Sequence, residues 1–130
     1  MRTRSRMVMG ALAMLVLATL AAAPAAQAKA GDVIERGSCS DASTWKLKLS
    51  QEDGKIEVEF EVDQNVVGDV WRVRILHDGE LVFSGRRTTQ APSGSFEVRI
   101  VEPNLAGTDR FVARARNLST DEVCRGSATF

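Results

Sequence analysis

The segment KIEVEFEVDQ holds three glutamates at alternate positions, and pairs of carboxylates are what most glycosidases use for catalysis. On a strand, carboxylates two positions apart lie on one face at a separation of about 7 Å, which would suit such a pair. A glycosidase also needs a cleft that raises the pKa of one carboxyl group, and a regular strand face supplies none. We therefore interpret Glu57, Glu59 and Glu61 as the solvated face of a sheet. Lys46 and Lys48 are their expected cross-strand partners.

Other residues with catalytic potential are few. The only histidine, His77, stands in the tripeptide His-Asp-Gly, and we interpret it as part of a hairpin turn. No G-x-S-x-G motif and no phosphate-binding glycine loop occurs. The oxygen-rich residues 63–65 with Asp69 could collect calcium, but their spacing is that of an ordinary polar connection. The sequence predicts no catalytic residue, no metal and no cofactor, and a deep pocket gathering His77 with distant carboxylates would instead favour an enzyme.

Cys39 and Cys124 are the only cysteines. An even number of cysteines in an exported protein predicts a disulfide, and two cysteines allow one pairing. That bond would link the start of the folded chain to its last strand. A pair of reduced, metal-binding thiols is the alternative, and the absence of a C-x-x-C motif argues against it.

The first 28 residues have the features of a secretory signal peptide. Three arginines precede the apolar run ALAMLVLATLAAA, which ends at Pro24 and is short for a membrane span. Ala26-Gln27-Ala28 predicts cleavage after Ala28, with Ala30 as the alternative. We expect residues 29–130 to be secreted as one domain, with no membrane insertion after cleavage. The arginine-rich, alanine-rich composition suggests a bacterial source.

Polar and apolar residues alternate through almost all of the mature chain, which predicts half-buried strands. The apolar positions of the seven expected strands begin at Trp45, Ile56, Trp71, Leu81, Phe96, Phe111 and Cys124. Asp53-Gly54 and Asp78-Gly79 predict tight hairpins between them. We predict an all-β fold, a seven-stranded antiparallel immunoglobulin-like sandwich, with a small closed β-barrel as the alternative. The antibody-type cysteine pair and tyrosine corner are missing.

Several segments together resemble a group of known proteins: WKLKLS, EDGKIEVEFEVDQNV, VWRVRILHDGELVF, APSGSFEVR and CRGSATF. They resemble small secreted actinobacterial proteins of unassigned function, in which a single immunoglobulin-like β-sandwich follows a signal peptide. The resemblance covers nearly all of the mature chain and implies the same fold and export. It carries no known active residues. Actinomycete chromophore-binding apoproteins are similar in size, export and fold class, but they have more disulfides and a deeper pocket.

Charge is distributed unevenly over the expected sandwich. Residues 31–130 hold 13 basic and 17 acidic side chains, a net charge of −4, which argues against a nucleic-acid-binding protein. In the usual strand order, the first, second and fifth expected strands share one sheet. The third, sixth and seventh share the other, with the fourth at its edge. The second sheet would then present six arginines to solvent: Arg72, Arg74, Arg110, Arg114, Arg116 and Arg125.

An arginine-lined sheet suits forked contacts with phosphate, carboxylate or sulfate groups. An anionic cell-wall polymer or an acidic protein surface is the expected partner, and the protein is expected to be a non-catalytic binding module. The alternative is that these arginines are merely solvated, or neutralised by Glu80, Glu97 or Glu122. Two other functions stay open: an inhibitor of secreted hydrolases that presents residues 88–94 or 102–107, and an enzyme.

Overall fold

The computed structural model describes residues 31–130, so the predicted signal peptide, residues 1–28, lies outside the described residues. The described part of the chain contains eight strands: β1 (Val33–Ser38), β2 (Thr44–Glu52), β3 (Lys55–Asp63), β4 (Val70–His77), β5 (Glu80–Thr88), β6 (Ser95–Pro103), β7 (Arg110–Asn117) and β8 (Val123–Thr129). In these hundred residues there is no helix of the length and apolar character that crossing a membrane requires.

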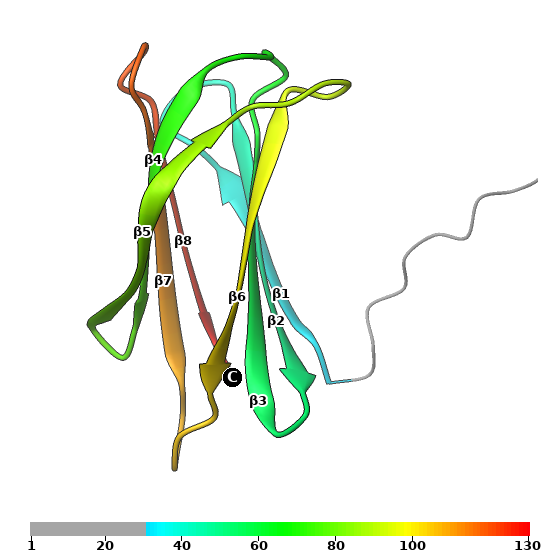
Figure 1. Ribbon diagram of the computed structural model, residues 1–130, viewed down its shortest axis with the longest axis vertical. Helices are drawn as coiled ribbons and strands as arrows, with labels where there is room; N and C mark the ends of the chain where they lie inside the picture. Colours follow the sequence, from blue (N-terminus) through cyan, green and yellow to red (C-terminus); the bar gives the residue numbers. More distant parts are fainter. Residues whose placement is uncertain (1–30) are drawn as a thin grey trace, which may run out of the picture.

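The strands form two antiparallel sheets that face each other, with orders β1-β2-β3-β6 and β5-β4-β7-β8 (Figure 1). This arrangement confirms the immunoglobulin-like sandwich and the predicted division of strands between the sheets. It also places β5 at a sheet edge, as expected. The two sheets stay separate, so the alternative of a small closed barrel was wrong.

The predicted number of strands was too low by one, because β1 was missed. This strand lies at the edge of its sheet and pairs only with β2. Its register positions on the core side are Val33, Glu35 and Gly37, which lie opposite large apolar residues of β2. A charged residue and a glycine at these positions remove the alternation by which a strand is recognised in a sequence.

The core lies between the two sheets and contains the inward residues of the alternating segments. Trp71, Phe111 and Phe60 are fully buried, as the alternation predicts. The Trp71 ring packs against Phe96 with 5.9 Å between ring centroids. Its Nε1 donates a hydrogen bond of 2.9 Å to Gln64 Oε1, so the one polar atom of the ring has a partner.

A disulfide and a tryptophan ring join the sheets where β1 lies close to β8. Cys39 and Cys124 form the predicted bond, with 4.3 Å between their Cα atoms. Nearby, the Trp45 ring lies so close to Gly37 and Gly126 that a Cβ there would approach it to 2.7 and 2.4 Å. The two strands can therefore enclose the ring only if both positions are glycine.

The connection between β3 and β4 is held by hydrogen bonds. Asp69 Oδ2 accepts from Asn117 Nδ2 at 2.9 Å and from Gln64 Nε2 at 2.6 Å, and these bonds lower the pKa of Asp69. Two of the side chains considered as calcium ligands, Asp69 and Gln64, therefore make hydrogen bonds within the fold.

The two loops considered for an inhibitor, residues 88–94 and 102–107, lie at opposite ends of β6.

Candidate functional site

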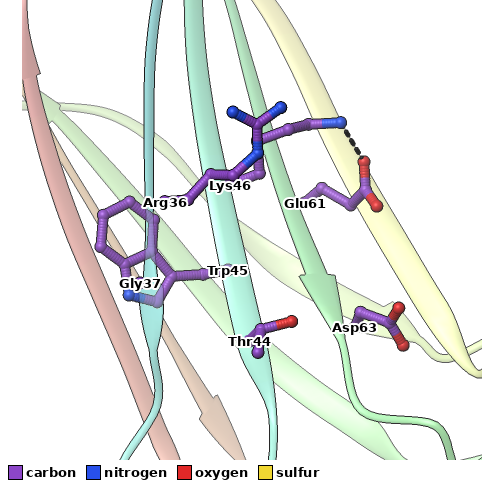
Figure 2. Close-up of a pocket in the computed structure, with 7 residues that line it drawn as sticks. All are labelled: Arg36, Gly37, Thr44, Trp45, Lys46, Glu61 and Asp63. Atoms are coloured by element: carbon purple, nitrogen blue, oxygen red, sulfur yellow. Dashed lines mark hydrogen bonds and ion pairs between the residues drawn. The ribbon is translucent and has the colours of Figure 1, made fainter.

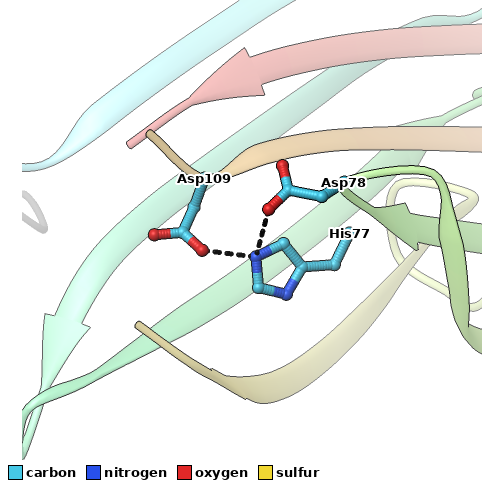
Figure 3. A group of neighbouring side chains, drawn as sticks. All are labelled: His77, Asp78 and Asp109. Atoms are coloured by element: carbon cyan, nitrogen blue, oxygen red, sulfur yellow. Dashed lines mark hydrogen bonds and ion pairs between the residues drawn. The ribbon is translucent and has the colours of Figure 1, made fainter. Parts of the chain in front are cut away.

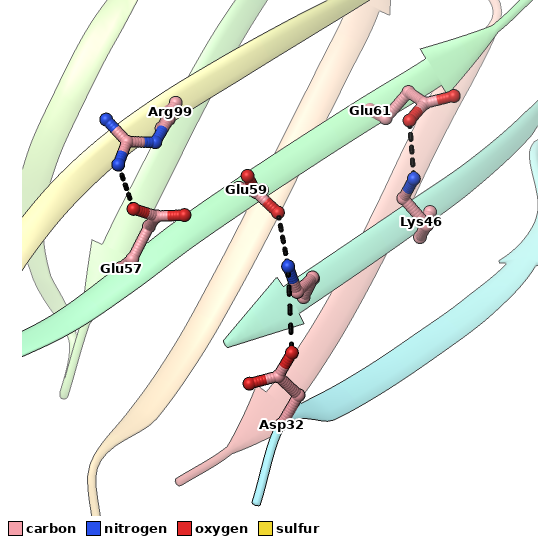
Figure 4. Close-up of polar contacts among 7 residues, drawn as sticks. Asp32, Lys46, Glu57, Glu59, Glu61 and Arg99 are labelled. Carbon is pink, nitrogen blue, oxygen red and sulfur yellow. Dashed lines mark hydrogen bonds and ion pairs between the residues drawn. The ribbon is translucent and has the colours of Figure 1, made fainter. Parts of the chain in front are cut away.

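The outer side of the sheet β1-β2-β3-β6 carries three acid–base pairs. We call seven of its outward charged residues the paired face: Lys46, Lys48, Glu57, Glu59, Glu61, Glu97 and Arg99. Arg36 also lies on this side, directly opposite Lys46. The Nζ atom of Lys46 lies 2.6 Å from Glu61, and that of Lys48 lies 3.2 Å from Glu59 (Figure 4). Arg99 forms an ion pair with Glu57. The predicted pairing of Lys46 and Lys48 with the glutamates of β3 is confirmed. Each of Glu57, Glu59 and Glu61 forms an ion pair with a basic side chain.

These ion pairs affect the titration of the paired face. The hydrogen bond from Arg99 lowers the pKa of Glu57, whose side chain is only 9% exposed. The hydrogen bond to Glu59 raises the pKa of Lys48. Glu97 differs from the rest, because burial and the nearby charges of Glu59 and Glu61 raise its pKa. The negative charge of Glu97 is therefore disfavoured in the folded protein, whereas that of Glu57 is favoured.

An open pocket of about 520 Å³ lies beside the paired face (Figure 2). Its lining residues are Arg36, Gly37, Thr44, Trp45, Lys46, Glu61 and Asp63. Two of these are basic and two are acidic, and the ion pair between Lys46 and Glu61 belongs to the lining. The pocket therefore offers no concentration of one charge for a ligand to recognise.

The opposite outer surface is lined with arginines in two rows across the strands. In one row Arg72 lies between Arg86 and Arg116, and in the other Arg114 lies between Arg74 and Arg125. We call this surface the arginine face: Arg72, Arg74, Arg86, Arg110, Arg114, Arg116 and Arg125, all exposed. The structure thus brings all six predicted arginines onto one outer surface. It adds Arg86, whose register with β4 depends on a bulge between Ile75 and Leu76.

Within residues 31–130, Arg116 is the only member of the arginine face that forms an ion pair, 2.5 Å from Asp121. The glutamates considered as neutralising groups do not reach this face. Glu97 lies on the paired face. The Glu122 carboxylate is buried and accepts hydrogen bonds from Ser43, and Glu80 forms no ion pair with a described residue. Among the described residues, the other six arginines of this face therefore have no ion-pair partner.

The arginine face also contains a hollow. This open pocket of about 560 Å³ is lined by Leu76, Asp78, Gly79, Arg110, Val112, Arg114 and Arg125. Leu76 and Val112 are direct register partners on the outer side of β4 and β7, and they supply apolar surface between the arginines. The hollow suits an anionic group carried on a sugar or apolar framework, because it combines guanidinium groups with apolar contact.

The hairpin turn at Asp78-Gly79 is confirmed, but His77 lies directly before the turn and is buried, which the sequence did not predict. His77 is the last residue of β4 and is only 5% exposed, and its ring lies beside the carboxylates of Asp78 and Asp109 (Figure 3). Its Nε2 lies 2.5 Å from Asp109 Oδ1, and its Nδ1 lies 3.5 Å from Glu102. All ionic partners of the imidazole in the described residues are carboxylates, and none of these residues supplies the hydroxyl or thiol nucleophile of a hydrolytic triad.

A scan of protein-family models matches none of them, and searches of curated proteins and of solved structures find no match to this chain. The resemblance to secreted actinobacterial proteins therefore stays a prediction. Function has to be inferred from the geometry and charge of the residues themselves.

Proposed function

We propose that this protein is a secreted, non-catalytic binding module that contacts an anionic cell-surface polymer or an acidic protein surface through the arginine face. The observation that carries the proposal is the two rows of exposed arginines. Each row lies in register across three strands, and together they cover all four strands of the sheet. Six of the seven arginines have no carboxylate partner among residues 31–130.

The energetics of strand pairing support a role for this arrangement. Like charges directly opposite each other on neighbouring strands destabilise a sheet, whereas opposite charges stabilise it. On the other sheet three bases do lie beside acids, although Glu97 faces Glu61 and Arg36 faces Lys46 there. An anionic partner would reduce the repulsion among the arginines and would gain charge-assisted, forked hydrogen bonds.

The expected ligand group is a sulfate, carboxylate or phosphate. The remainder of the domain is acidic enough to give residues 31–130 a net charge of −4. A polyanion is therefore attracted by one face and repelled by the rest, which favours an oriented contact over general adhesion. The hollow around Leu76 and Val112 would admit one such group together with part of its carrier.

Secretion rests on two observations. Residues 1–28 have the composition of a signal peptide. The disulfide between Cys39 and Cys124 is of a kind that persists in oxidising compartments outside the cytosol.

The test is retention on sulfated-polysaccharide beads and on isolated bacterial cell wall at physiological salt. We expect the unaltered protein to be retained on both materials and the double variant Arg72→Glu/Arg114→Glu to be washed off. The matched control is Arg36→Glu/Lys55→Glu, which makes the same change in net charge at exposed positions of the other sheet. Equal behaviour of the two variants, or no retention of the protein itself, would end the proposal.

A further inference from the structure

A second cluster of side chains lies at the end of the sandwich that contains the β4–β5 turn. There His77, Asp78 and Asp109 each offer one ligand atom, and these atoms all lie within 4.8 Å of one another, with both carboxylates directed at the imidazole nitrogen (Figure 3). His77 and Asp109 are buried, whereas Asp78 is exposed. Among residues 31–130, no other group of histidine, cysteine or acidic side chains converges in this way.

The fold holds each of the three side chains in place. Asp78 Oδ1 accepts a hydrogen bond of 2.8 Å from the Arg110 backbone, and Oδ2 lies 3.6 Å from His77 Nε2. The backbone of Asp109 is paired in both directions with that of Phe130, at 2.9 and 3.2 Å. The His77 ring is stacked on Phe111 with 4.3 Å between ring centroids.

The other imidazole nitrogen faces a carboxylate from the opposite sheet. His77 Nδ1 lies 3.5 Å from Glu102 Oε2, and Glu102 belongs to β6. Metal-binding histidines usually donate their second ring N–H to such a group, which fixes the ring orientation and raises the basicity of the ligating nitrogen. Nε2 faces Asp78 and is hydrogen-bonded to Asp109 Oδ1.

The charge balance of the cluster also favours a cation. Three carboxylates, those of Asp78, Glu102 and Asp109, surround one imidazole, and no lysine or arginine of the described residues forms an ion pair with them. The Asp109 side chain is 1% exposed, and its Oδ1 is hydrogen-bonded to His77 Nε2 and accepts from the Leu105 backbone at 3.3 Å. Buried carboxylates are normally hydrogen-bonded and paired with cations or bound to metals, and here no lysine or arginine among residues 31–130 supplies the cation.

We propose that His77, Asp78 and Asp109 bind one divalent transition-metal ion of the zinc class, with Glu102 as a positioning residue. One imidazole nitrogen with two carboxylate oxygens is a donor set that such ions accept. The exposed Asp78 lies on the route from solvent. The ion would tie the β4–β5 turn to the connection between β6 and β7, and its ligand Asp78 also lines the hollow of the arginine face.

The test uses untagged protein titrated with Zn²⁺, followed by calorimetry and by NMR of the imidazole ring. His77 is the only histidine and both cysteines are in a disulfide, so any imidazole signal reports this cluster. We expect binding of one Zn²⁺ per chain, a saturable shift of the ring resonances and a thermal midpoint that rises with Zn²⁺ concentration.

Three variants and a control locate the ion. Asp78→Asn and Asp109→Asn should each abolish or strongly weaken binding, and Glu102→Gln should weaken it about 10- to 100-fold. Asp121→Asn, which removes an exposed carboxylate in the turn before β8, should bind as the unaltered protein does. Asp78 is exposed, so its variant tests the proposal even if Asp109→Asn fails to fold. Absence of a ring shift at millimolar Zn²⁺ would show that His77 and Asp109 form only a structural hydrogen bond. Unchanged affinity in Asp78→Asn would contradict the proposed set of ligands.

Discussion

The two outer surfaces of the sandwich present the same backbone geometry with opposite charge arrangements. On the paired face, the basic groups of Lys46, Lys48 and Arg99 each lie beside a glutamate. On the arginine face, Arg72 and Arg114 each lie between two further arginines in register. The first arrangement stabilises a sheet and the second destabilises it. This difference between the two faces is the basis of the proposal that the arginine face contacts a partner.

The largest effect is expected from breaking the link between the two sheets. Replacing both cysteines, Cys39→Ser/Cys124→Ser, should lower the free energy of unfolding by about 2–4 kcal/mol, because the bond closes a loop of 85 residues. Urea denaturation measures this loss. Polymer binding should be unchanged where the variant is still folded, since neither sheet surface is altered. A stability loss below about 0.5 kcal/mol, well under the usual range, would contradict the structural role of the bond.

On the paired face, Glu57→Gln should lower the free energy of unfolding by about 1 kcal/mol at neutral pH, because it removes the charge-assisted bond with Arg99. The pKa of Glu57 is lowered in the folded state, so its contribution is complete above pH 4.5 and is lost as the pH falls through the lower folded value. Denaturation curves of both proteins should therefore converge in acid. A constant difference at every pH would rule out the ion pair as the cause.

On the arginine face, removal of one charge should raise the free energy of unfolding, whereas on the paired face it lowers it at Glu57. Arg114→Gln should raise the free energy of unfolding by roughly 0.2–1 kcal/mol, because Arg114 faces Arg74 on one side and Arg125 on the other. The gain should shrink as salt screens the repulsion. Thermal or urea denaturation at low and high salt measures it. Destabilisation at low salt would mean that the arginines are compensated after all.

The smallest effect is expected at Glu97, which lies directly opposite Glu61 on the paired face. Its pKa is raised, so its charge opposes folding once the pH rises above 4.5 toward the folded value. Glu97→Gln should therefore raise stability at pH 7, near the low end of ~0.2–1 kcal/mol, and have no effect in acid. The pH dependence is opposite in sign to that at Glu57, and the same denaturation series measures both.

The sequence was sufficient to predict the fold and the six arginines because the alternation of residues decides which side of a sheet each side chain occupies. Arg86 was missed because its register with Arg72 depends on the bulge in the pairing of β4 with β5, where Leu76 pairs with Leu81 but Ile75 pairs with Phe83. The partners of His77 were missed for another reason. Glu102 and Asp109 are 25 and 32 positions away in the sequence, and only the packing of strand ends brings them to the imidazole.

The most direct test of the arginine face is NMR of the arginine side-chain N–H groups during titration with a sulfated oligosaccharide at physiological salt. The proposed function predicts saturable shifts at Arg72, Arg74 and Arg114, while Arg36 and Arg99 on the other sheet stay unchanged. Shifts of similar size on both sheets, or no saturable shift at any arginine, would contradict it.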